Sequence, residues 1–143
     1  MKVLVVDDSK IVRDRLVSLL DSIDGVDIVE QAEDGRSAIL ANNNLKPNVI
    51  ILDIRMDEWN GIQLLKKFKN SRSDQKIIML TNFPYPQYRK KCLDEGADYF
   101  LDKSTEFDEV ARIINRLAKK HGSSAQEGPP GALRPASGRK YYE

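Results

Sequence analysis

Short apolar runs recur along the chain at Val3–Val6, Val49–Leu52, Ile77–Leu80 and Tyr99–Leu101. Each run is rich in β-branched or aromatic residues and only three or four residues long, which indicates buried strands rather than helices. A fifth run, 26–29, is interrupted by an aspartate, as is typical of a strand at the edge of a sheet. The pattern therefore predicts five strands.

Apolar residues recur at helical spacing between these runs. The first stripe consists of Val12, Leu16, Leu19, Leu20 and Ile23, and the last of Phe107, Val110, Ala111, Ile114, Leu117 and Ala118. Weaker helical patterns cover 35–44, 61–71 and 86–95. Ile113 lies just outside the last stripe, so we expect its side chain on the surface.

Strands beginning near residues 2, 26, 48, 76 and 98 are thus each followed by a helix. Strict alternation of strand and helix implies right-handed crossovers and a parallel sheet covered on both faces. The fold class is α/β, and we find no internal repeat.

Composition places one folded unit at residues 1–120, because 41% hydrophobic and 31% charged residues in a chain of 143 are ordinary for a globular domain. Ten of the 23 residues from His121 to Glu143 are Gly, Pro or Ser. This composition predicts a flexible tail, 121–143, that is too short for a second domain.

Charge and cysteine content exclude several classes of protein. The formal net charge of +1 argues against bulk electrostatic binding to nucleic acid. A single cysteine excludes an intramolecular disulfide and a four-cysteine zinc site. No apolar stretch approaches the roughly 20 residues of a membrane span, and no signal peptide is evident. We expect a cytoplasmic protein without membrane insertion.

Polar residues stand where the predicted strands end, at Asp7-Asp8, Asp53, Thr81 and Lys103. Each alone has an ordinary explanation, such as a helix cap or a solvated loop. Ligands of open parallel sheets, however, collect at the carboxyl ends of the strands, and the strand pattern sends all of these side chains to that edge. Their combination favours a functional site.

Three clustered carboxylates repel one another and need a compensating cation. Oxygen ligands without His or Cys favour Mg²⁺, with Mn²⁺ as an alternative. A carboxylate nucleophile, a lysine and a hydroxyl beside such an ion suit phosphoryl transfer. The absence of a Walker-type loop disfavours nucleotide hydrolysis.

Several motifs together resemble the receiver domain of two-component response regulators over residues 2 to about 120. They are Asp7-Asp8, Asp53 with Met56 three and Gly61 eight residues later, Thr81, Gly96-Ala97-Asp98 and Lys103. The resemblance implies a doubly wound (βα)5 flavodoxin-like fold, with a parallel five-stranded sheet of order 2-1-3-4-5 and five helices.

The resemblance also implies a role for each site residue. Asp53 is the expected phosphoacceptor, and Asp8, Asp53 and the backbone carbonyl of Arg55 are the expected direct Mg²⁺ ligands. Asp7 is expected to act through a bound water. Thr81 and Lys103 are expected to contact the phosphoryl group, and Phe100 occupies the switch-aromatic position. Phe100 lacks the hydroxyl of the family's common Tyr, and Ser104 replaces its proline.

The function implied is that of a single-domain response regulator, a signalling protein with only slow autocatalytic chemistry and not an enzyme. It would take its phosphoryl group from a histidine kinase or a histidine phosphotransfer protein. Output would run through the helix at 86–95, the strand near 99–101 and the last helix. The partner there is either a second copy, which we favour slightly, or another signalling protein.

Three rival interpretations stay open. A phosphatase of the haloacid dehalogenase type needs a second aspartate two residues after its nucleophile, where this chain has Arg55. A DNA-binding regulator requires that the chain be a fragment of a longer protein, since no helix-turn-helix module fits after residue 120. A receiver-like binding module that is never phosphorylated would be distinguished by a phosphorylation assay.

Overall fold

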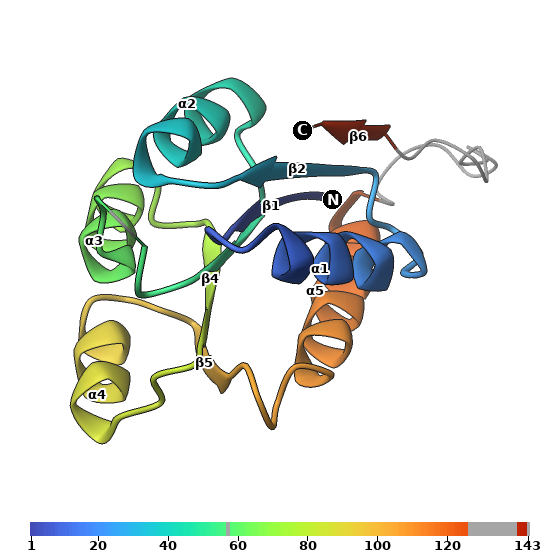
Figure 1. Cartoon of the computed structure of the whole chain (residues 1–143). Helices are drawn as coiled ribbons and strands as arrows, with labels where there is room; N and C mark the ends of the chain where they lie inside the picture. The colour runs from blue at the N-terminus through green and yellow to red at the C-terminus, as the bar shows by residue number, and fades with distance from the viewer. Residues whose placement is uncertain (57, 126–139, 143) are drawn as a thin grey trace, which may run out of the picture.

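A computed structural model describes residues 1–56, 58–125 and 140–142, and its strands and helices alternate from β1 to α5 (Figure 1). The strands are β1 (Lys2–Val6), β2 (Ile28–Ala32), β3 (Val49–Leu52), β4 (Lys76–Thr81), β5 (Tyr99–Asp102) and β6 (Lys140–Tyr142). The helices are α1 (Lys10–Asp21), α2 (Gly35–Leu45), α3 (Gly61–Ser71), α4 (Pro86–Asp94) and α5 (Glu109–Ala125). The predicted alternation is confirmed, although β2 begins two residues after the expected start.

The sheet has the order β5-β4-β3-β1-β2-β6, and every pairing is parallel. Its first five strands therefore have the expected order 2-1-3-4-5, and the flavodoxin-like fold is confirmed. In the register, Val6 at the end of β1 lies beside both Ala32 of β2 and Leu52 of β3. The carboxyl ends of these central strands are consequently level, so the residues that follow them meet at one edge.

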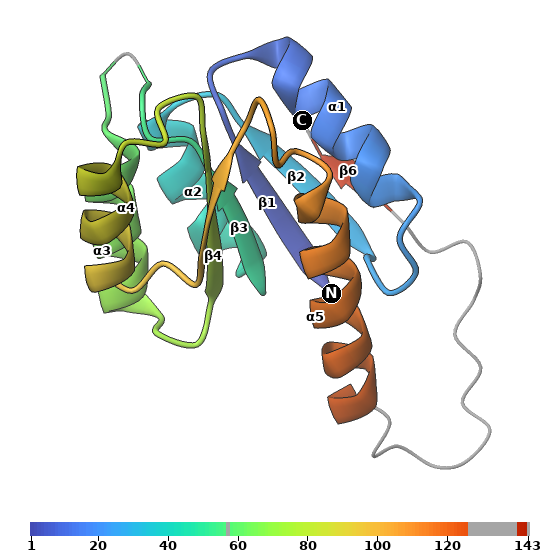
Figure 2. The ribbon, with the colours of Figure 1, turned by 90° about the horizontal axis from the view of Figure 1, so that it is seen from below.

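Helices cover both faces of the sheet, with α1 and α5 on one side and α2, α3 and α4 on the other (Figure 2). Side chains of β1 alternate between the two cores. Val3 and Val5 pack in the cluster that includes Leu16 of α1, whereas Leu4 and Val6 pack with Phe68 of α3. Because both faces are buried, the central strands β1, β3 and β4 are nearly continuous apolar runs rather than alternating ones, whereas β2 contains Glu30 and Gln31.

Polar side chains start the helices close to the strand ends. The Ser9 hydroxyl accepts a hydrogen bond from the Val12 N–H, 3.3 Å away, and so caps α1. Asp34 and Asn60 begin α2 and α3 with capping boxes. Within the described residues, no helix combines the length and apolar character that a membrane crossing requires.

The expectation that Ile113 lies on the surface is wrong. Its side chain is only 4% exposed and belongs to the core cluster between the sheet, α1 and α5. Val110 and Ile114 lie in the same cluster, so the buried face of α5 is wider than the stripe read from the sequence. A partner surface on α5 must therefore be sought among its other residues.

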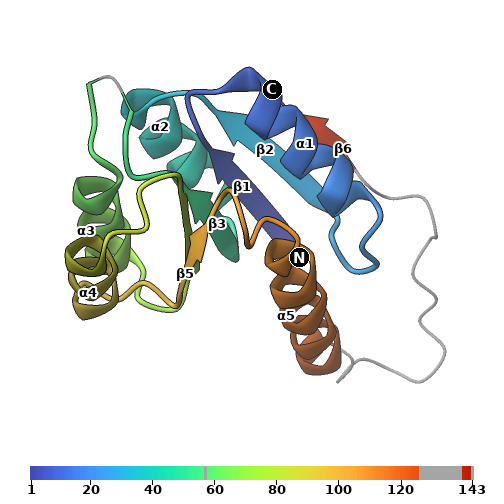
Figure 3. The same ribbon diagram turned by 60° about the horizontal axis from the view of Figure 1, so that its bottom comes forward.

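The boundary predicted at residue 120 falls inside α5, which continues to Ala125. The residues after Lys120 are small or polar and contain no proline before Pro129, and Gly122 costs a helix only about 1 kcal/mol. At the far end of the chain, β6 pairs with β2, with Lys140 opposite Ile28 (Figure 3). The rest of the predicted flexible tail, 126–139 and 143, lies outside the described residues.

Truncation after Ala125 is expected to leave the melting temperature within about 2 °C of the full chain, because three residues of edge strand bury little surface. Truncation after Lys120 should lower it further, since it removes the last turns of α5. Thermal unfolding of the two truncated chains beside the full chain measures both effects. A drop above about 5 °C on removing 126–143 alone would show that the C-terminal segment stabilises the fold.

Candidate functional site

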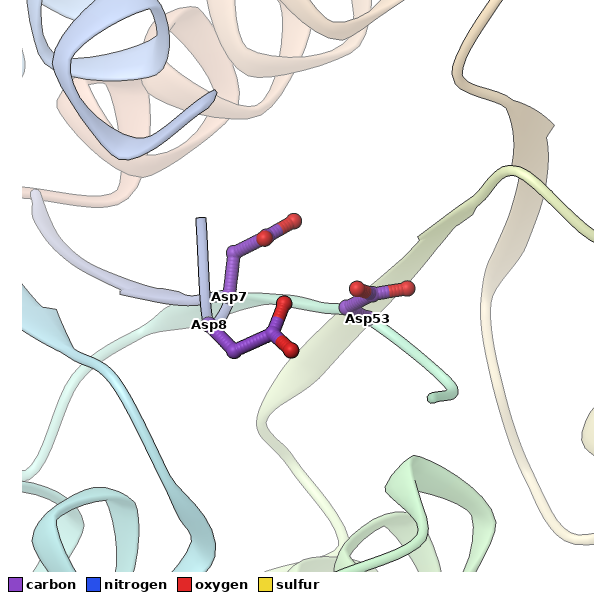
Figure 4. A group of neighbouring side chains, drawn as sticks. All are labelled: Asp7, Asp8 and Asp53. Carbon is purple, nitrogen blue, oxygen red and sulfur yellow. The ribbon is translucent and has the colours of Figure 1, made fainter. Parts of the chain in front are cut away.

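The ends of β1 and β3 bring three carboxylates together. The Asp7 N–H donates to the Ala32 carbonyl and the Asp53 N–H to the Val6 carbonyl, each at 3.1 Å, so both residues extend the ladders of the central strands. Asp8 follows Asp7, and one oxygen from each of the three carboxylates can be chosen so that all lie within 4.8 Å of one another (Figure 4).

The three carboxylates differ in exposure. Asp7 is 2% exposed and Asp53 is 5% exposed, whereas Asp8 is open to solvent. Each buried carboxylate accepts a backbone hydrogen bond through Oδ1, from the Ser9 N–H to Asp7 at 2.9 Å and from the Ile54 N–H to Asp53 at 2.8 Å. The N-cap of α1 is Ser9, so neither Asp7 nor Asp8 serves as the cap of this helix.

Lys103 joins the two buried carboxylates. Its Nζ lies 2.6 Å from Asp7 Oδ2 and 3.3 Å from Asp53 Oδ2, and its side chain is 8% exposed. The Lys103 N–H donates to the Thr81 carbonyl at 2.8 Å. This bond continues the β4–β5 ladder and fixes the position of Lys103 along the edge of the sheet. The ammonium thus links β1, β3 and β5 at the carboxyl edge of the sheet.

Burial and charge shift the pKa values of this group in a connected way. Burial, aided by the negative charge of Asp7, raises the pKa of Asp53 to about 6, although Lys103 opposes the shift. Burial by itself lowers the pKa of Lys103, but its hydrogen bond to Asp7 and the charges of both carboxylates raise it above the usual value. Lys103 therefore stays charged, and Asp53 takes up a proton at a higher pH than an ordinary aspartate does.

Gly61 allows the loop after β3 to fold back over the strand end. Its N–H donates to the Ile54 carbonyl at 2.6 Å, and a Cβ at this position would lie 1.9 Å from the Asp53 carbonyl oxygen. Between them, Arg55 and Asn60 form a bridge that closes the loop. Only glycine permits so close an approach, which explains the glycine in the sequence motif.

Thr81 and Phe100 lie on neighbouring strands in different surroundings. Thr81 is fully buried at the end of β4, and its Oγ1 accepts a hydrogen bond from the Phe83 N–H at 2.9 Å. Phe100 of β5 is 4% exposed and packs in the core on the α2–α4 face. The Arg89 guanidinium of α4 lies 5.6 Å from the centre of its ring. Phe100 is therefore not part of the carboxylate group, although it joins α4 to β5.

Ser104, which stands where the family has proline, makes contacts that proline cannot make. Its N–H and hydroxyl both donate to Asp102 Oδ1, at 2.9 and 2.7 Å. The Asp102 N–H in turn donates to Glu106 Oε1 at 3.1 Å. These bonds fold the loop after Lys103 without a proline.

The structure also shows contacts that the sequence did not indicate, made by Arg13 and by the side chain of Arg55. Arg13 of α1 donates from Nη1 to the Asp7 carbonyl at 2.8 Å and from Nε to Gln31 Oε1 at 3.1 Å. The Arg55 guanidinium stacks 4.0 Å from the Phe83 ring centre and donates to the Tyr88 hydroxyl at 3.4 Å. The aromatic residues Phe83, Tyr85 and Tyr88 are the sequence signal that could have indicated this contact.

Comparison with known proteins places the chain in a family. The model of the response regulator receiver domain matches residues 3–115. The response regulator protein VraR of Staphylococcus saprophyticus subsp. saprophyticus is 31% identical over 116 residues, which are 81% of this chain and 56% of that protein. The response regulator GacA of Pseudomonas protegens is 32% identical over 114 residues, 80% of this chain and 54% of that protein. The chain thus spans just over half the length of these relatives.

Solved structures agree with this assignment. A Francisella response regulator receiver domain superposes with a TM-score of 0.75 at 29% identity, covering 84% of this chain and 98% of that one. The response regulator domain of Thermotoga maritima CheB superposes with a TM-score of 0.71 at 31% identity, covering 91% of this chain and 98% of that one. By the extent of the family match and these likenesses, the chain belongs to the receiver domain family of two-component response regulators.

Proposed function

We propose that the chain is a phosphoacceptor switch in which Asp53 takes a phosphoryl group from a phosphohistidine of a kinase or phosphotransfer protein. The observation that carries this assignment is the placement of Asp53. It is a buried carboxylate at the end of a central strand, grouped with Asp7 and Asp8 and paired with Lys103. The family membership supports a signalling role of this kind.

In the reaction, an Asp53 carboxylate oxygen forms a bond to phosphorus while the bond from phosphorus to the donor's nitrogen breaks. The electron pair of the broken bond stays on the imidazole of the donor. Lys103 lies 3.3 Å from Asp53 Oδ2 and would pair with the added negative charge. The Thr81 hydroxyl, one strand away at the same edge, would donate to a phosphoryl oxygen.

The residues at this edge fit a divalent cation. The donor atoms are all oxygen and close together, which matches the preference of Mg²⁺ and, less strictly, Mn²⁺. Asp8, Asp53 and the Arg55 carbonyl would hold the ion directly, and Asp7 would act through a water. When bound, Mg²⁺ would offset the charge of the carboxylates and of the phosphoryl group.

The contacts of Lys103 explain how phosphorylation could reach the surface. Without a phosphoryl group, Lys103 is held by Asp7 at 2.6 Å as well as by Asp53. A phosphoryl group on Asp53 would draw both Lys103 and the Thr81 hydroxyl towards it. Thr81 ends β4 and Lys103 follows the end of β5, and Phe100 links β5 to α4 through Arg89. The face formed by α4, β5 and α5 would therefore respond.

Two of the rival interpretations lose ground. The position two residues after Asp53 is Arg55, whose side chain is exposed and stacked on Phe83, so it supplies no carboxylate for a dehalogenase-type phosphatase. A module that is never phosphorylated has no need for a buried lysine shared between two carboxylates.

The direct test is incubation with a small phosphodonor and Mg²⁺, followed by intact mass measurement. Absence of a one-phosphate adduct under these conditions would overturn the assignment.

Asp8→Ala is expected to weaken Mg²⁺ binding by about ten-fold or more while the fold persists, because Asp8 is exposed and makes up a third of the acidic group. Stability in metal-free buffer should stay equal or rise slightly, since one repelling charge is removed. Trp59, half-buried in the loop after β3, provides a fluorescence signal for the titration. Glu58→Ala, an exposed acidic residue of the same loop, is the matched control. Unchanged affinity in Asp8→Ala would remove Asp8 from the ligand set.

A further inference from the structure

Positive charge is concentrated on three helices of the molecule. Helix α3 has three lysines and no acidic residue, α4 has three basic residues and one acidic residue, and α5 has four basic residues and one acidic residue. Their combined excess is +8, whereas the whole chain has a net charge of only +1, so the remainder carries −7. Of these helices, α5 has the most basic residues.

The basic residues of α5 line one exposed strip, which we call the α5 basic stripe. It consists of Arg112, Arg116, Lys119 and Lys120, which together with Asn115 border a shallow groove of about 480 Å³. Arg112 pairs with Glu109 at 2.8 Å, and the Arg116 guanidinium lies 6.0 Å from the ring centre of Tyr99 on β5. Lys119 makes no ion pair within the described part of the chain. The stripe therefore keeps a surplus of positive charge next to an aromatic side chain.

Three possible occupants of this groove can be compared by charge. A second copy placed symmetrically on the same face would bring two α5 basic stripes together, and like charges oppose that contact. The C-terminal segment 126–143 has three basic and two acidic residues, so it is not complementary either. Nucleic acid would meet the stripe but also the acidic remainder of the molecule, which weakens phosphate binding.

We propose that the α5 basic stripe docks an acidic protein segment, such as a helix of about two to three turns with carboxylates on one face and apolar residues beside them. The stripe spans residues 112–120, or about 12 Å of helix at 1.5 Å per residue. The half-buried Tyr99, held under Arg116, supplies apolar contact beside the charges. Such a segment would be opposite to the stripe in charge and similar to it in length.

This docking site deepens the proposed function and rests on it for its regulation. Tyr99 begins β5 and Lys103 follows its end, so a shift of Lys103 towards a phosphoryl group would act on the strand that carries the aromatic part of the surface. If the partner contacts β5 differently before and after this shift, its affinity for the α5 basic stripe would depend on phosphorylation.

The test uses the full chain and a labelled 14-residue helical peptide designed with glutamates on one face and leucines on the adjacent one. Its matched probe has glutamine in place of each glutamate. The double variant Arg116→Glu/Lys119→Glu is compared with Lys66→Glu/Lys67→Glu, which makes the same charge change on exposed residues of α3. Fluorescence anisotropy measures binding, and thermal unfolding confirms that both variants fold.

We expect the glutamate peptide to bind wild type at least about ten-fold more tightly than the glutamine peptide, and the α5 variant to lose that advantage. The α3 variant should stay within about two-fold of wild type, and rising salt should weaken binding. Equal binding to both variants would overturn the proposal. So would stronger binding of a short DNA duplex, or a wild-type dimer that the α5 variant dissociates.

Phosphorylation by a small phosphodonor is measured in parallel on all three proteins. Neither pair of substituted residues contacts the carboxylate group, so each variant should accept the phosphoryl group at the wild-type rate. Failure of all three to become phosphorylated would count against the proposed function, while the peptide comparison would still decide the docking site.

Discussion

Asp53→Asn is expected to abolish phosphorylation and also to stabilise the metal-free protein at neutral pH. The amide of asparagine is not a nucleophile, so no adduct should form at this position. Its neutrality removes the burial of a negative charge beside Asp7. The pKa of Asp53 is raised from 3.8 to about 6. At 1.36 kcal/mol per pKa unit, burial of the ionised Asp53 carboxylate therefore lowers the free energy of unfolding by about 3 kcal/mol at pH values above 6. A gain of about 2–3 kcal/mol in the free energy of unfolding is therefore expected.

The dependence on pH follows from the direction of the shift. The native state binds the Asp53 proton more tightly than the unfolded state does, so the contribution of Asp53 to the stability of wild type falls as pH rises from about 4 through about 6. Asp53→Asn lacks this term. Its advantage should be absent below about pH 4 and complete above about pH 6.

Denaturant unfolding of wild type and Asp53→Asn across this range, in buffer with a chelator, measures the difference. Asp74→Asn is the control, because Asp74 is 81% exposed and its removal should change stability by no more than about 0.5 kcal/mol. A phosphoryl adduct that persists in Asp53→Asn would exclude Asp53 as the acceptor. An advantage that does not vary with pH would show that charge burial is not its cause.

Lys103→Met should have the opposite effect on stability. It removes the ammonium that lies between Asp7 and Asp53 and leaves two buried carboxylates without their cation. Breaking a buried ion pair costs about 3–5 kcal/mol. We expect about 3 kcal/mol, because Asp53 can relieve part of the repulsion by taking up a proton. Mg²⁺ should recover part of the loss, since it supplies the missing positive charge to the same oxygens.

Unfolding curves with and without Mg²⁺ measure the loss and its recovery. Lys90→Met is the matched control, since Lys90 pairs with Asp94 on an exposed helix surface and should contribute less than about 1 kcal/mol. Amide exchange over residues 81–104, with and without a phosphate mimic, tests the switch. Equal protection changes in wild type and Lys103→Met would remove Lys103 from the coupling role.

The parallel α/β sheet and the shared edge of Asp7, Asp53 and Lys103 could be derived from the chain alone for a simple reason, whereas the order of the strands came from the family resemblance. Both faces of the sheet are covered, so the central strands are short apolar runs. Asp7, Asp53 and Thr81 are each the first polar residue after such a run, and Lys103 is the second, after Asp102. Parallel strands end at one edge, and residues next to the run ends must therefore meet.

The surface of α5 could not be derived in the same way. Helical periodicity placed Ile113 outside the buried stripe, but α5 packs against both the sheet and its neighbour α1, and these two contacts bury a wider face than one stripe. The extent of α5 was also hidden, because small polar residues neither start nor stop a helix decisively. Side-chain burial on a helix depends on how many neighbours flank it, which the local pattern does not contain.

By itself, the sequence determined which groups could carry the chemistry, because strand ends and residue types are local properties of the chain. Only the tertiary structure decided how those groups are paired. Lys103 is 96 residues from Asp7, yet its ammonium donates to the Asp7 carboxylate at 2.6 Å and to the Asp53 carboxylate at 3.3 Å. The same holds for the Arg116 guanidinium over the Tyr99 ring. Such pairings arise from the packing of distant segments, so no window of sequence encodes them.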